Sequence, residues 1–509
     1  LVGSEMCIRD SAGSIFSRVW KKNAGHVAGK ERTLNEIEHE ILRKMDEPRI
    51  HVAIVCASVS CPDLRLEAFK VDSLNEQLDD QMKMFLKSSE KGMKIDNERN
   101  RVYLSSIFKW FEDDFKSRGG VLKFIANYVS PDVEKKLTRS GIKIYYLEYK
   151  LKKYVYTSFG VMKSRPGLII ELSDDNGNIG LGEIWCNFPS NSASYKFQLF
   201  KDIFANKLLN KNINEPGSIL TIFDDIKTIF IQADELGIFN SILSALNCAI
   251  WDLFAQKKKL PLNKLINKNS TNKMKVYASG INPSDSIKSI NLGRKKGIKA
   301  FKFKIGFNNT LDLNFIKKIN NNISIDEFYM FDVNQGWKIN DAKKFINKLS
   351  KFSIHWVEEP ISALTDQDIY LKFIKSSKLP IALGENVNDK DQFSKFLSNK
   401  YVKYIQPDLT KYGGISMLDK YFKSKHKNKI YLHFLGSGVG LVTSAHVMSA
   451  INANGYLEMD LNNNPLRDSL FTQEIKVLNG NILLNDLPGI GFKLNKKIIK
   501  KYQVDFFTI

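Results

Sequence analysis

Seven short apolar segments between Phe301 and Asp460 carry polar or charged residues that could perform acid–base chemistry. They are FKFKIG with Lys302 and Lys304, FDVNQGW with Asp332 and Asn334, HWVEEP with Glu358, ALGEN with Glu385, IQPDL with Asp408, YLHF with His433, and YLEMD with Glu458. A charge inside a buried strand is costly unless it is paired or bound to a metal. The segments recur about every 25 residues, the repeat of a β/α barrel whose reactive groups lie at the carboxyl ends of its strands.

Three of these carboxylates, Asp332, Glu358 and Glu385, come from successive expected strands. At the mouth of a barrel they would repel one another unless a cation lay between them, and oxygen ligands favour Mg²⁺ before Mn²⁺ or Ca²⁺. Within VEEP only one glutamate can point inward, so we expect Glu358 to do so and Glu359 to face the helices. The sequence therefore predicts Mg²⁺ as the cofactor.

Lys304 is the predicted base, because a neighbouring divalent cation disfavours the ammonium form of a lysine. Lys302, on the same strand face, would hold a substrate carboxylate or tune Lys304. Asp408, bonded to one ring nitrogen of His433, would fix the tautomer and raise the basicity of the other nitrogen. Glu458 could donate a hydrogen bond to a developing enolate. Acid and base groups on opposite faces of one carbon suit proton abstraction followed by reprotonation or elimination.

Each residue also has a structural explanation when taken alone. Lys302 could be a solvated lysine, His433 a core histidine and Asp332 an Asx cap. We favour the catalytic interpretation because independent accidents would not keep a constant register along successive strands. His355 and His446 do not fit that register and are predicted to be structural.

Composition narrows the class of protein. The chain has 509 residues, which predicts two to four domains, and a formal net charge of +21. Lysine is spread evenly and no basic cluster contains interleaved aromatic residues, so we expect no nucleic-acid partner. No apolar run reaches the roughly 20 residues that span a bilayer, so no membrane association is expected. The five cysteines are few and scattered, which suits a cytoplasmic protein without structural disulfides.

The chain before residue 142 is predicted to contain a separate domain. Residues 1–11, LVGSEMCIRDS, resemble translated sequencing-adapter sequence and are left out of the fold. In residues 12–140, Thr33 and Glu36 form a capping-box pattern, His51 to Val55 suggest a buried strand, and the apolar spacing from Leu104 to Phe115 suggests a helix. The segments TLNEIEH, RIHVAIVCASVSCP and SSIFKWFEDDF resemble the DUF547 family, whose activity is unassigned.

His51, Cys56 and Cys61 leave two interpretations of this first domain open. One is thiol catalysis. The other, which we favour, is a structural histidine beside a buried cysteine, because no third residue that would orient the histidine can be named. The pair Cys56 and Cys61 is a weak zinc signal, since a second pair is missing.

Residues 142–270 begin with an expected strand, IKIYYLEYKL, and a hairpin, GLIIELSDDNGNIGLGEIW, with an Asp-Asn-Gly turn. SILSALNCAIWDLF is an expected helix. From residue 271 to 470, strands are expected at KVYASG, AFKFKIG, FYMFDVN, IHWVEEP, PIALGEN, VKYIQPD, KIYLHF and GYLEMD, with helices between them such as Asp341–Leu349 and Asp391–Leu397. Residues 471–509 return to a hairpin pattern and should pack back on residues 142–270.

Residues 142–509 resemble the enolase superfamily, in its mandelate racemase/muconate-lactonizing-enzyme group. The resemblance is carried by KFK, FDVNQGW, VEEP, GEN, PDLTKYGG, the late histidine and glutamate, SALNCAIWDL and the closing PGIGF. It implies an α+β capping domain at 142–270, a (β/α)7β modified TIM barrel at 271–470, a C-terminal segment at 471–509, and one Mg²⁺ that stabilises an enediolate. It also implies Asp332, Glu358 and Glu385 as metal ligands, Lys304 as first base, and the pair Asp408–His433 as second acid/base.

The pattern of one lysine and one histidine is similar to the racemase and acid-sugar dehydratase branch. It implies a hydro-lyase acting on an acid sugar or hydroxy acid, with racemisation or epimerisation of a 2-hydroxy acid as the alternative. An alternative of another class is a non-catalytic scaffold or binding protein on a decayed barrel. The substrate is expected to be a small-molecule carboxylate and the protein a homo-oligomer. A genuine fusion with the first domain and a chimera of two genes both remain open.

Substrate-binding residues are predicted from the cap loops, which shape specificity in this group. The loops are Thr157–Arg165 and Trp185–Ser190, and they supply Phe159, Arg165 and Trp185. Asn334, on the same strand face as Asp332, completes the predicted binding set.

Overall fold

The computed structural model describes residues 21–27, 29–55, 61–96, 101–118, 120–134, 141–157, 160–174, 176–208, 211, 213–418, 421–422, 424, 426–452 and 454–509. The chain divides into two compact units, Leu1–Ser140 and Gly141–Ile509. The predicted adapter-derived segment 1–11 lies outside the described residues, as do Cys56 and Phe159.

The first unit is a small mixed α/β structure around a core that includes Val52, Met82, Phe108 and Phe115. Its two antiparallel ribbons are β1 (Asn23–Val27) with β2 (Lys30–Thr33), and β3 (Met93–Asp96) with β4 (Arg101–Leu104). Its helices are η1 (Glu36–Leu42), η2 (Arg43–Met45), α3 (Ile50–Ala53), η3 (Val71–Ser73), α4 (Leu74–Lys87), α5 (Ser106–Trp110), η4 (Glu112–Arg118), α6 (Val121–Ile125) and η5 (Ala126–Tyr128).

Two predictions for this unit have different outcomes. The capping box is confirmed: the Glu36 amide donates to Thr33 Oγ1 at 3.1 Å, and the Thr33 amide donates to Glu36 Oε2 at 2.8 Å. The strand expected from His51 to Val55 is wrong, because α3 occupies Ile50–Ala53. Arg49 explains the helical turn, since its guanidinium bonds Glu47 and Asp79 at once and fixes the chain entering α3. The helix expected around Leu104 to Phe115 is split into α5 and η4.

The second unit begins with an antiparallel sheet in the order β17-β5-β6-β7. Its strands are β5 (Gly141–Thr157), β6 (Gly160–Ser173), β7 (Ile179–Ile184) and β17 (Gln503–Thr508). The expected hairpin is confirmed as β6 and β7, which pair through Ile169 and Glu183. The accompanying helices are α8 (Ser192–Leu199), η6 (Phe200–Ala205), α9 (Asn206–Leu208), η7 (Pro216–Ser218), α10 (Ile219–Ile222), α11 (Asp224–Gln232), α12 (Leu236–Lys258) and α13 (Leu262–Ile266).

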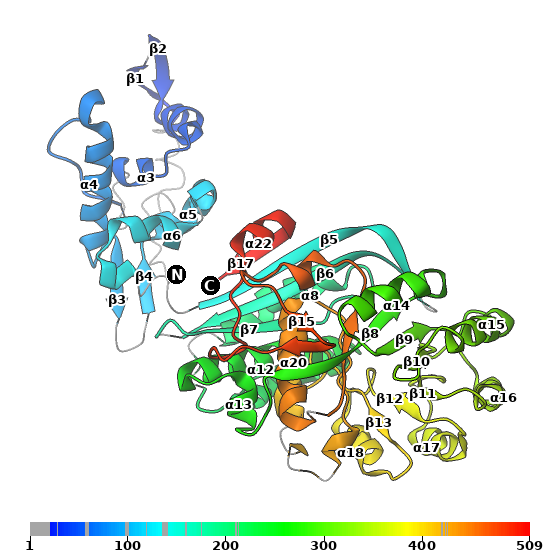
Figure 1. The fold of residues 1–509 in the computed structure, drawn as a ribbon. Coiled ribbons are helices and arrows are strands. Elements are labelled where there is room, and N and C mark those ends of the chain that lie inside the picture. The colour runs from blue at the N-terminus through cyan, green and yellow to red at the C-terminus, as the bar shows by residue number, and fades with distance from the viewer. Residues whose placement is uncertain are drawn as a thin grey trace. The chain divides into compact units, whose positions relative to one another are not determined.

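A parallel sheet follows in the order β14-β8-β9-β10-β11-β12-β13. Its strands are β8 (Lys273–Ile281), β9 (Ala300–Lys304), β10 (Phe328–Asp332), β11 (Ile354–Glu358), β12 (Ile381–Leu383), β13 (Tyr404–Ile405) and β14 (Leu457–Asp460). The helices are η8 (Pro283–Asp285), α14 (Ser286–Lys295), α15 (Asn309–Asn320), α16 (Ile339–Leu349), α17 (Gln367–Ser376), α18 (Lys390–Ser398), α19 (Gly414–Leu418), η10 (Lys427–Lys429), α20 (Gly438–Ile451), α21 (Pro465–Asp468) and α22 (Lys496–Tyr502). Figure 1 shows α15, α16 and α17 on the outer side of the strands.

The seventh expected strand, KIYLHF, is reduced to a single parallel bridge between Ile405 and Ile430. Among the described residues no hydrogen-bonded ladder joins this segment to β14, so the sheet pairing does not by itself describe a closed barrel. Inward-facing side chains nevertheless meet across the curved sheet: Trp356 on β11 packs against Tyr277 on β8 at 5.6 Å between ring centroids and against Tyr431 at 5.8 Å. A short antiparallel hairpin, β15 (Val477–Leu478) and β16 (Asn481–Leu483), adds to the start of β8.

Two buried carboxylates, on β7 and α12, join the antiparallel sheet to the rest of the second unit through hydrogen bonds. Glu183 on β7 accepts from the Ser437 amide at 2.6 Å, the Ser437 hydroxyl at 2.7 Å and the Gly440 amide at 2.7 Å, at the start of α20. Asp252 on α12 accepts from the amides of Leu181 and Ile490. Burial raises the pKa of each carboxyl to about 7. These contacts hold β7 against α12 and α20.

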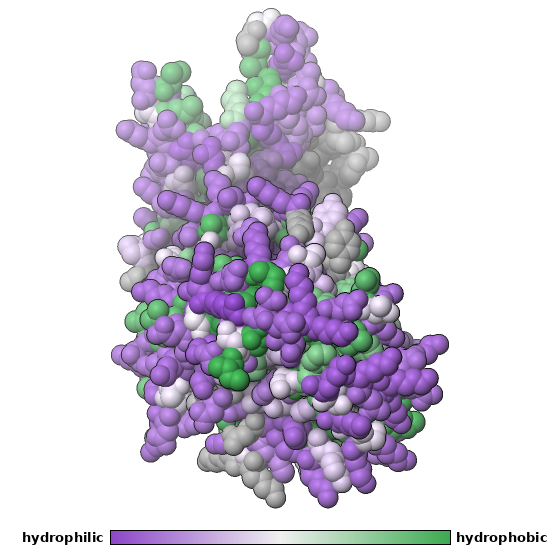
Figure 2. All heavy atoms as spheres, turned by 45° about the vertical axis from the view of Figure 1, so that its right-hand side comes forward, coloured by the Kyte–Doolittle hydropathy of each residue, from purple (hydrophilic) through white to green (hydrophobic). Residues whose placement is uncertain are grey.

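The surface seen in Figure 2 is mostly hydrophilic, with apolar side chains in small separate patches. Within the described residues, α12 is long and apolar enough to cross a membrane, but 78% of its apolar window is buried inside the protein. This is the behaviour of a core helix.

Close packing of β7 on α12 depends on two glycines. A Cβ atom at Gly182 would lie 2.0 Å from the carbonyl oxygen of Ala245, and one at Gly180 would lie 2.0 Å from that of Ala249. Any side chain at these positions would push the helix away from the strand.

We expect Gly182→Ala to lower the free energy of unfolding by about 1–3 kcal/mol, because it overpacks this contact. Gly237→Ala, on α12 with open space around its Cβ position, is the matched control and should change stability by less than about 1 kcal/mol. Thermal unfolding followed by circular dichroism measures both. Equal melting temperatures for Gly182→Ala and the wild type would contradict the close contact.

Candidate active site

The predicted catalytic residues lie at the carboxyl ends of the parallel strands. Lys302 lies within β9 and Lys304 ends it, Asp332 ends β10, Glu358 ends β11, and Glu458 lies on β14. Glu385, Asp408 and His433 lie just beyond β12, β13 and the Ile430 bridge. Because parallel strands end at the same edge of a sheet, these side chains gather in one region.

Lys302 is the centre of a buried ionic network. Its side chain is only 2% exposed, and its ammonium lies 2.5 Å from Glu358 Oε1, 2.8 Å from Glu458 Oε1 and 3.7 Å from Asp332 Oδ2. Burial alone would lower the pKa of Lys302, but the charges of Glu358 and Glu458 outweigh it and hold the pKa well above 10.5. Tyr277 completes the network by donating to Glu458 Oε2 at 3.0 Å.

Glu358 points into the interior as predicted. Its Oε2 accepts from Trp356 Nε1 at 3.1 Å and from Gln406 Nε2 at 2.8 Å. Burial raises the pKa of this carboxyl to about 7, and the Lys302 ammonium opposes the shift. Sequence reasoning missed Tyr277 and Gln406, although both sit in expected strands and could have been noted as polar groups in apolar runs.

Lys304 lies beside Asp332 and Asn334. Its ammonium donates to Asp332 Oδ2 at 2.6 Å and to Asn334 Oδ1 at 2.7 Å. Asp332 Oδ1 also accepts from the Asn334 amide, which holds Asn334 at a positive φ of 45°. Burial lowers the pKa of Lys304, but Asp332 outweighs burial and the pKa is raised. With Asp332 as its ion-pair partner and the charge of Glu385 nearby, Lys304 therefore favours its protonated form.

His433 bridges two carboxylates. Its Nδ1 lies 2.8 Å from Asp408 Oδ2, as predicted for an oriented histidine, and its Nε2 lies 2.9 Å from Glu385 Oε2. Asp408 is held in turn by the amide and hydroxyl of Thr410, at 2.7 and 2.6 Å. Burial lowers the pKa of His433, but Glu385 and Glu458 outweigh burial and raise it well above 6.5.

Lys304 and His433 both line a cavity of about 230 Å³. Arg165, Trp185, Asn334 and Glu458 line it too, so four of the predicted binding and catalytic side chains share it with the lysine and the histidine. Arg165, predicted as a substrate anchor, is buried and already paired with Asp460 at 2.6 Å. The predicted contact of Phe159 lies outside the described residues.

The expectation that Glu359 faces the helices is wrong. Glu359 is buried at a positive φ of 36°, and its Oε2 accepts from Asn386 Nδ2 at 2.8 Å. Burial, together with the charge of Glu385, raises its pKa to about 8. Strand alternation does not apply to it because β11 ends at Glu358. Glu359 and Asn386 thus join the acidic cluster at the strand ends.

Residues 288–498 match the family described as "Enolase C-terminal domain-like". The structure of a mandelate racemase/muconate lactonizing enzyme from Bordetella bronchiseptica RB50 is 26% identical, covers 71% of this chain and 99% of its own, and superposes with a TM-score of 0.64. Residues 141–509 belong to the enolase superfamily.

Two further relatives of this enolase-superfamily unit are informative. An arabinonate dehydratase from Saccharolobus solfataricus is 27% identical over 346 residues, which are 65% of this chain and 89% of the relative. The structure of L-talarate dehydratase from Polaromonas sp. JS666, complexed with Mg and L-glucarate, shares the fold with a TM-score of 0.60 at 20% identity, covering 73% of this chain and 98% of its own. Other relatives are named epimerases, racemases and cycloisomerases. The chain is therefore an enzyme of this superfamily.

Whether the three predicted ligands suit a cation depends on their chemistry and surroundings. Among the described residues no cluster of three or more His, Cys, Asp or Glu side chains is arranged as a metal site. Asp332, Glu358 and Glu385 are paired instead with Lys304, Lys302 and His433. Yet the charge of Glu385 acts on both Asp332 and Glu358, so the carboxylates lie within each other's field. Three neighbouring carboxylates are a donor set that fits a hard divalent cation.

Residues 6–86 match the family described as "Protein of unknown function, DUF547". In this first unit His51 Nε2 lies 2.9 Å from Asp114 Oδ2, which also bonds Arg43, and the imidazole stacks on Phe111 at 4.0 Å. Cys61 is disulfide-bonded, contrary to the expectation of a chain without disulfides, and so it is not a free nucleophile. Asp114 is an orienting partner that sequence reasoning did not find.

We expect His433 in the metal-free protein to stay protonated to pH values above its ordinary pKa of 6.5, and Asp408→Asn to lower its pKa by removing one neighbouring charge. Because the pKa is raised on folding, this pairing stabilises the protein fully below about pH 6.5 and the contribution is lost as pH rises through the raised pKa. Nitrogen-15 NMR of the histidine rings measures the protonation of His433 as a function of pH. His355 and His446, whose pKa burial lowers to about 4, are internal controls and should stay neutral at pH 6. A neutral His433 at pH 7 would contradict the assignment.

Proposed function

We propose that the enzyme abstracts the proton α to a carboxylate with the help of Mg²⁺, most simply to dehydrate an acid sugar or related hydroxy acid. The observation that carries the proposal is that Lys304 and an aspartate-paired His433 line the same cavity. One group can take a proton and the other can give one, on a substrate held between them. The substrate class is supported by relatives named as arabinonate and L-talarate/galactarate dehydratases.

Asp332, Glu358 and Glu385 would hold the ion. When bound, Mg²⁺ supplies positive charge that stabilises negative charge developing on the substrate carboxylate. Support for Mg²⁺ comes from the carboxylate donors and from neighbours of the same fold whose structures contain magnesium.

Lys304 would remove the α-proton. Its ammonium must first lose a proton, and its partner Asp332 is one of the proposed ligands. A carboxylate neutralised by a cation holds a lysine proton less strongly, so the pKa of Lys304 would fall toward the working pH. Asn334 positions the amine through its side-chain oxygen.

His433 would complete the reaction as the acid. In dehydration the α C–H bond breaks with its proton moving to Lys304, the β C–O bond breaks, and the hydroxyl leaves as water with the proton of His433 Nε2. The resulting enol becomes a 2-keto acid. Glu458, held by Tyr277 and Lys302, would hydrogen-bond the substrate oxygens.

Racemisation or epimerisation of a 2-hydroxy acid is the second candidate, because His433 could return a proton to the carbon instead of to a hydroxyl. Relatives named as epimerases and racemases support it. A non-catalytic scaffold is disfavoured because every predicted catalytic residue of the strand ends is present and faces the cluster. Accumulation of a 2-keto acid distinguishes dehydration from racemisation.

We also propose the finer organisation expected from the sequence. The parallel strands would close as a (β/α)7β barrel at 271–470, with the cap at 142–270 and the C-terminal segment at 471–509, beside a partial DUF547-like domain at 12–140. The aromatic contacts across the interior and the reach of Lys302 to both Glu358 and Glu458 support closure. A homo-oligomer and a cytoplasmic location remain predictions; the disulfide at Cys61 argues against the second.

Lys304→Ala should abolish α-deuterium exchange, with a loss of roughly 10²–10⁴-fold expected for removal of a general base. Purified protein with Mg²⁺ in D₂O is screened against a hydroxy-acid library by NMR. Lys344→Ala, an exposed lysine on α16, is the matched control and should exchange like the wild type. Deuterium exchange that persists in Lys304→Ala would contradict the role of Lys304 as the base.

Mg²⁺ binding should weaken by roughly tenfold or more in Asp332→Asn and in Glu385→Gln, because each change removes a charged ligand. Binding should also release protons, since the ion competes with Lys304 and His433 for these carboxylates. Isothermal titration calorimetry in two buffers of different ionisation enthalpy measures both quantities. The exposed Asp341→Asn is the control. Wild-type affinity in both ligand variants would count against the metal site.

A further inference from the structure

A second cavity, of about 470 Å³, adjoins the one that contains Lys304 and His433. The two share a wall made by Trp185, Phe188, Glu385, Asn386 and Lys411. The reaction proposed above uses no group on the far side of this wall. A substrate longer than the reacting centre could therefore extend from the first cavity into the second.

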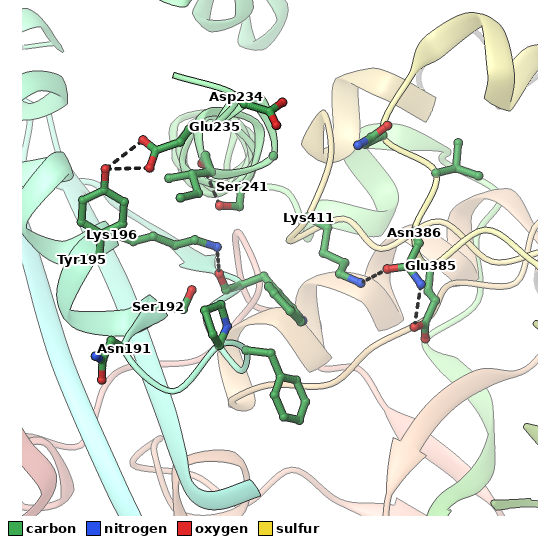
Figure 3. A pocket seen from close by; sticks show the side chains of 17 residues that line it. Asn191, Ser192, Tyr195, Lys196, Asp234, Glu235, Ser241, Glu385, Asn386 and Lys411 are labelled. Atoms are coloured by element: carbon green, nitrogen blue, oxygen red, sulfur yellow. Dashed lines mark hydrogen bonds between the residues drawn. The ribbon is translucent and has the colours of Figure 1, made fainter. Parts of the chain in front are cut away.

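Two lysines enter the second cavity. Figure 3 shows Lys196 and Lys411 approaching it from opposite sides, Lys196 from α8 and Lys411 from the segment after β13. Lys196 is 3% exposed and donates to the carbonyl oxygen of Trp185 at 2.6 Å, and Lys411 donates to Asn386 Oδ1 at 3.0 Å. Both ammonium groups lie over the Trp185 ring, at 5.2 and 4.6 Å from its centroid.

The positive charge of Lys196 has no counter-charge. In the part of the chain that the structure describes, neither ammonium has a carboxylate within ion-pair distance. Lys411 lies in the field of Glu385, whose pKa it helps to lower, whereas burial lowers the pKa of Lys196 to about 8, with smaller opposing effects of Cys186, which raises it, and Lys411, which lowers it. Glu235, on the rim of the cavity, does not pair with Lys196. Its carboxylate accepts from the Tyr195 hydroxyl and lies away from the lysine in Figure 3.

The indole N–H of Trp185 is a further polar group of a residue that lines this cavity. Trp185 Nε1 is buried and, among the described residues, has no hydrogen-bond partner. An ammonium carries three donors, and within the described part of the chain only one of those on Lys196 is engaged. A buried charge and a buried N–H without partners are both costly unless an acceptor completes them. A carboxylate offers two acceptor oxygens and the missing negative charge.

We propose that this cavity binds the distal carboxylate of a dicarboxylic acid whose α-carbon end occupies the neighbouring cavity. The inference rests on the proposed function and specifies its substrate class. The lysine ammonium of Lys196 would pair with the distal carboxylate, and Lys411 and Trp185 would add hydrogen bonds. The apolar side chains Phe188, Ile238 and Val387 line the route and suit a spacer of methylene groups.

Lys196 could serve only to hold the Trp185 carbonyl, and the experiment separates the two roles. Affinities are measured by calorimetry on the full chain with Mg²⁺, using 2-hydroxyglutarate, 2-hydroxyadipate and 2-hydroxypimelate. Each diacid is compared with the monoacid of the same carbon count, namely 2-hydroxypentanoate, 2-hydroxyhexanoate and 2-hydroxyheptanoate. The readout is the ratio of diacid to monoacid affinity, which a purely structural role leaves unchanged.

At the best chain length the diacid should bind about 10- to 100-fold tighter than its monoacid, the range for a charged hydrogen bond. Lys196→Met should reduce the ratio to within about twofold, whereas Lys196→Arg keeps the charge and most of the preference. Lys258→Met, an exposed lysine on α12, is the matched control and should keep the wild-type ratio. Should Lys196→Met fail to fold, Lys411→Met gives the second measurement and should reduce the ratio.

No diacid preference at any length in the wild type, or a preference that survives Lys196→Met, overturns the subsite. α-Deuterium exchange of the same compounds reports separately on the chemistry. Exchange without a diacid preference overturns the subsite and leaves the proposed function standing. A diacid preference that depends on Lys196, without exchange of any compound, supports the subsite and counts against the proposed function.

Discussion

Charge compensation inside a water-poor pocket is the constraint on which the catalytic end of this protein depends. Burying one carboxylate without a partner is costly, and here at least five lie together at the strand ends. Lys302 satisfies Glu358 and Glu458, Lys304 satisfies Asp332, and His433 satisfies Asp408 and Glu385. Lys302 and His433 each bridge two carboxylates, so a change in the charge of one member alters the proton affinity of its neighbours. The same coupling that stabilises the resting pocket gives it the means to move protons.

The scaffold places these groups through backbone register. Parallel pairing sets Asp332 beside Lys304 and Glu358 on adjacent strands, so the reactive ends are aligned by the hydrogen bonds of the sheet. Below them, Trp356 and Tyr277 fill the interior and exclude water. This layer supports the charged groups from beneath, with Trp356 Nε1 and Gln406 fixing Glu358.

Much of this arrangement could be predicted from sequence, and the failures have physical causes. Period-two alternation placed Lys302, Lys304 and Glu358 on the inner face correctly because these residues lie within regular strands. Alternation failed for Glu359, which follows the strand end and takes a positive φ. The segment His51 to Val55 is rich in β-branched and aliphatic residues, but tertiary contacts through Arg49 select a helical turn. The pairing of Arg165 with Asp460, 295 residues away, and the role of Lys196 depend on long-range contacts that no local pattern reveals.

The three hydrogen bonds that Glu183 accepts from the start of α20 have a consequence for how such an enzyme can change over evolutionary time. Glu183 lies two residues before Trp185, which lines both cavities. The helix that Glu183 bonds, α20, follows His433 in the chain. The anchoring point is thus separate from the side chains that meet the substrate. Replacements at Trp185 or Phe188 can alter which molecules are accepted while the acid–base apparatus stays in place, so new substrates can be acquired without rebuilding the reaction.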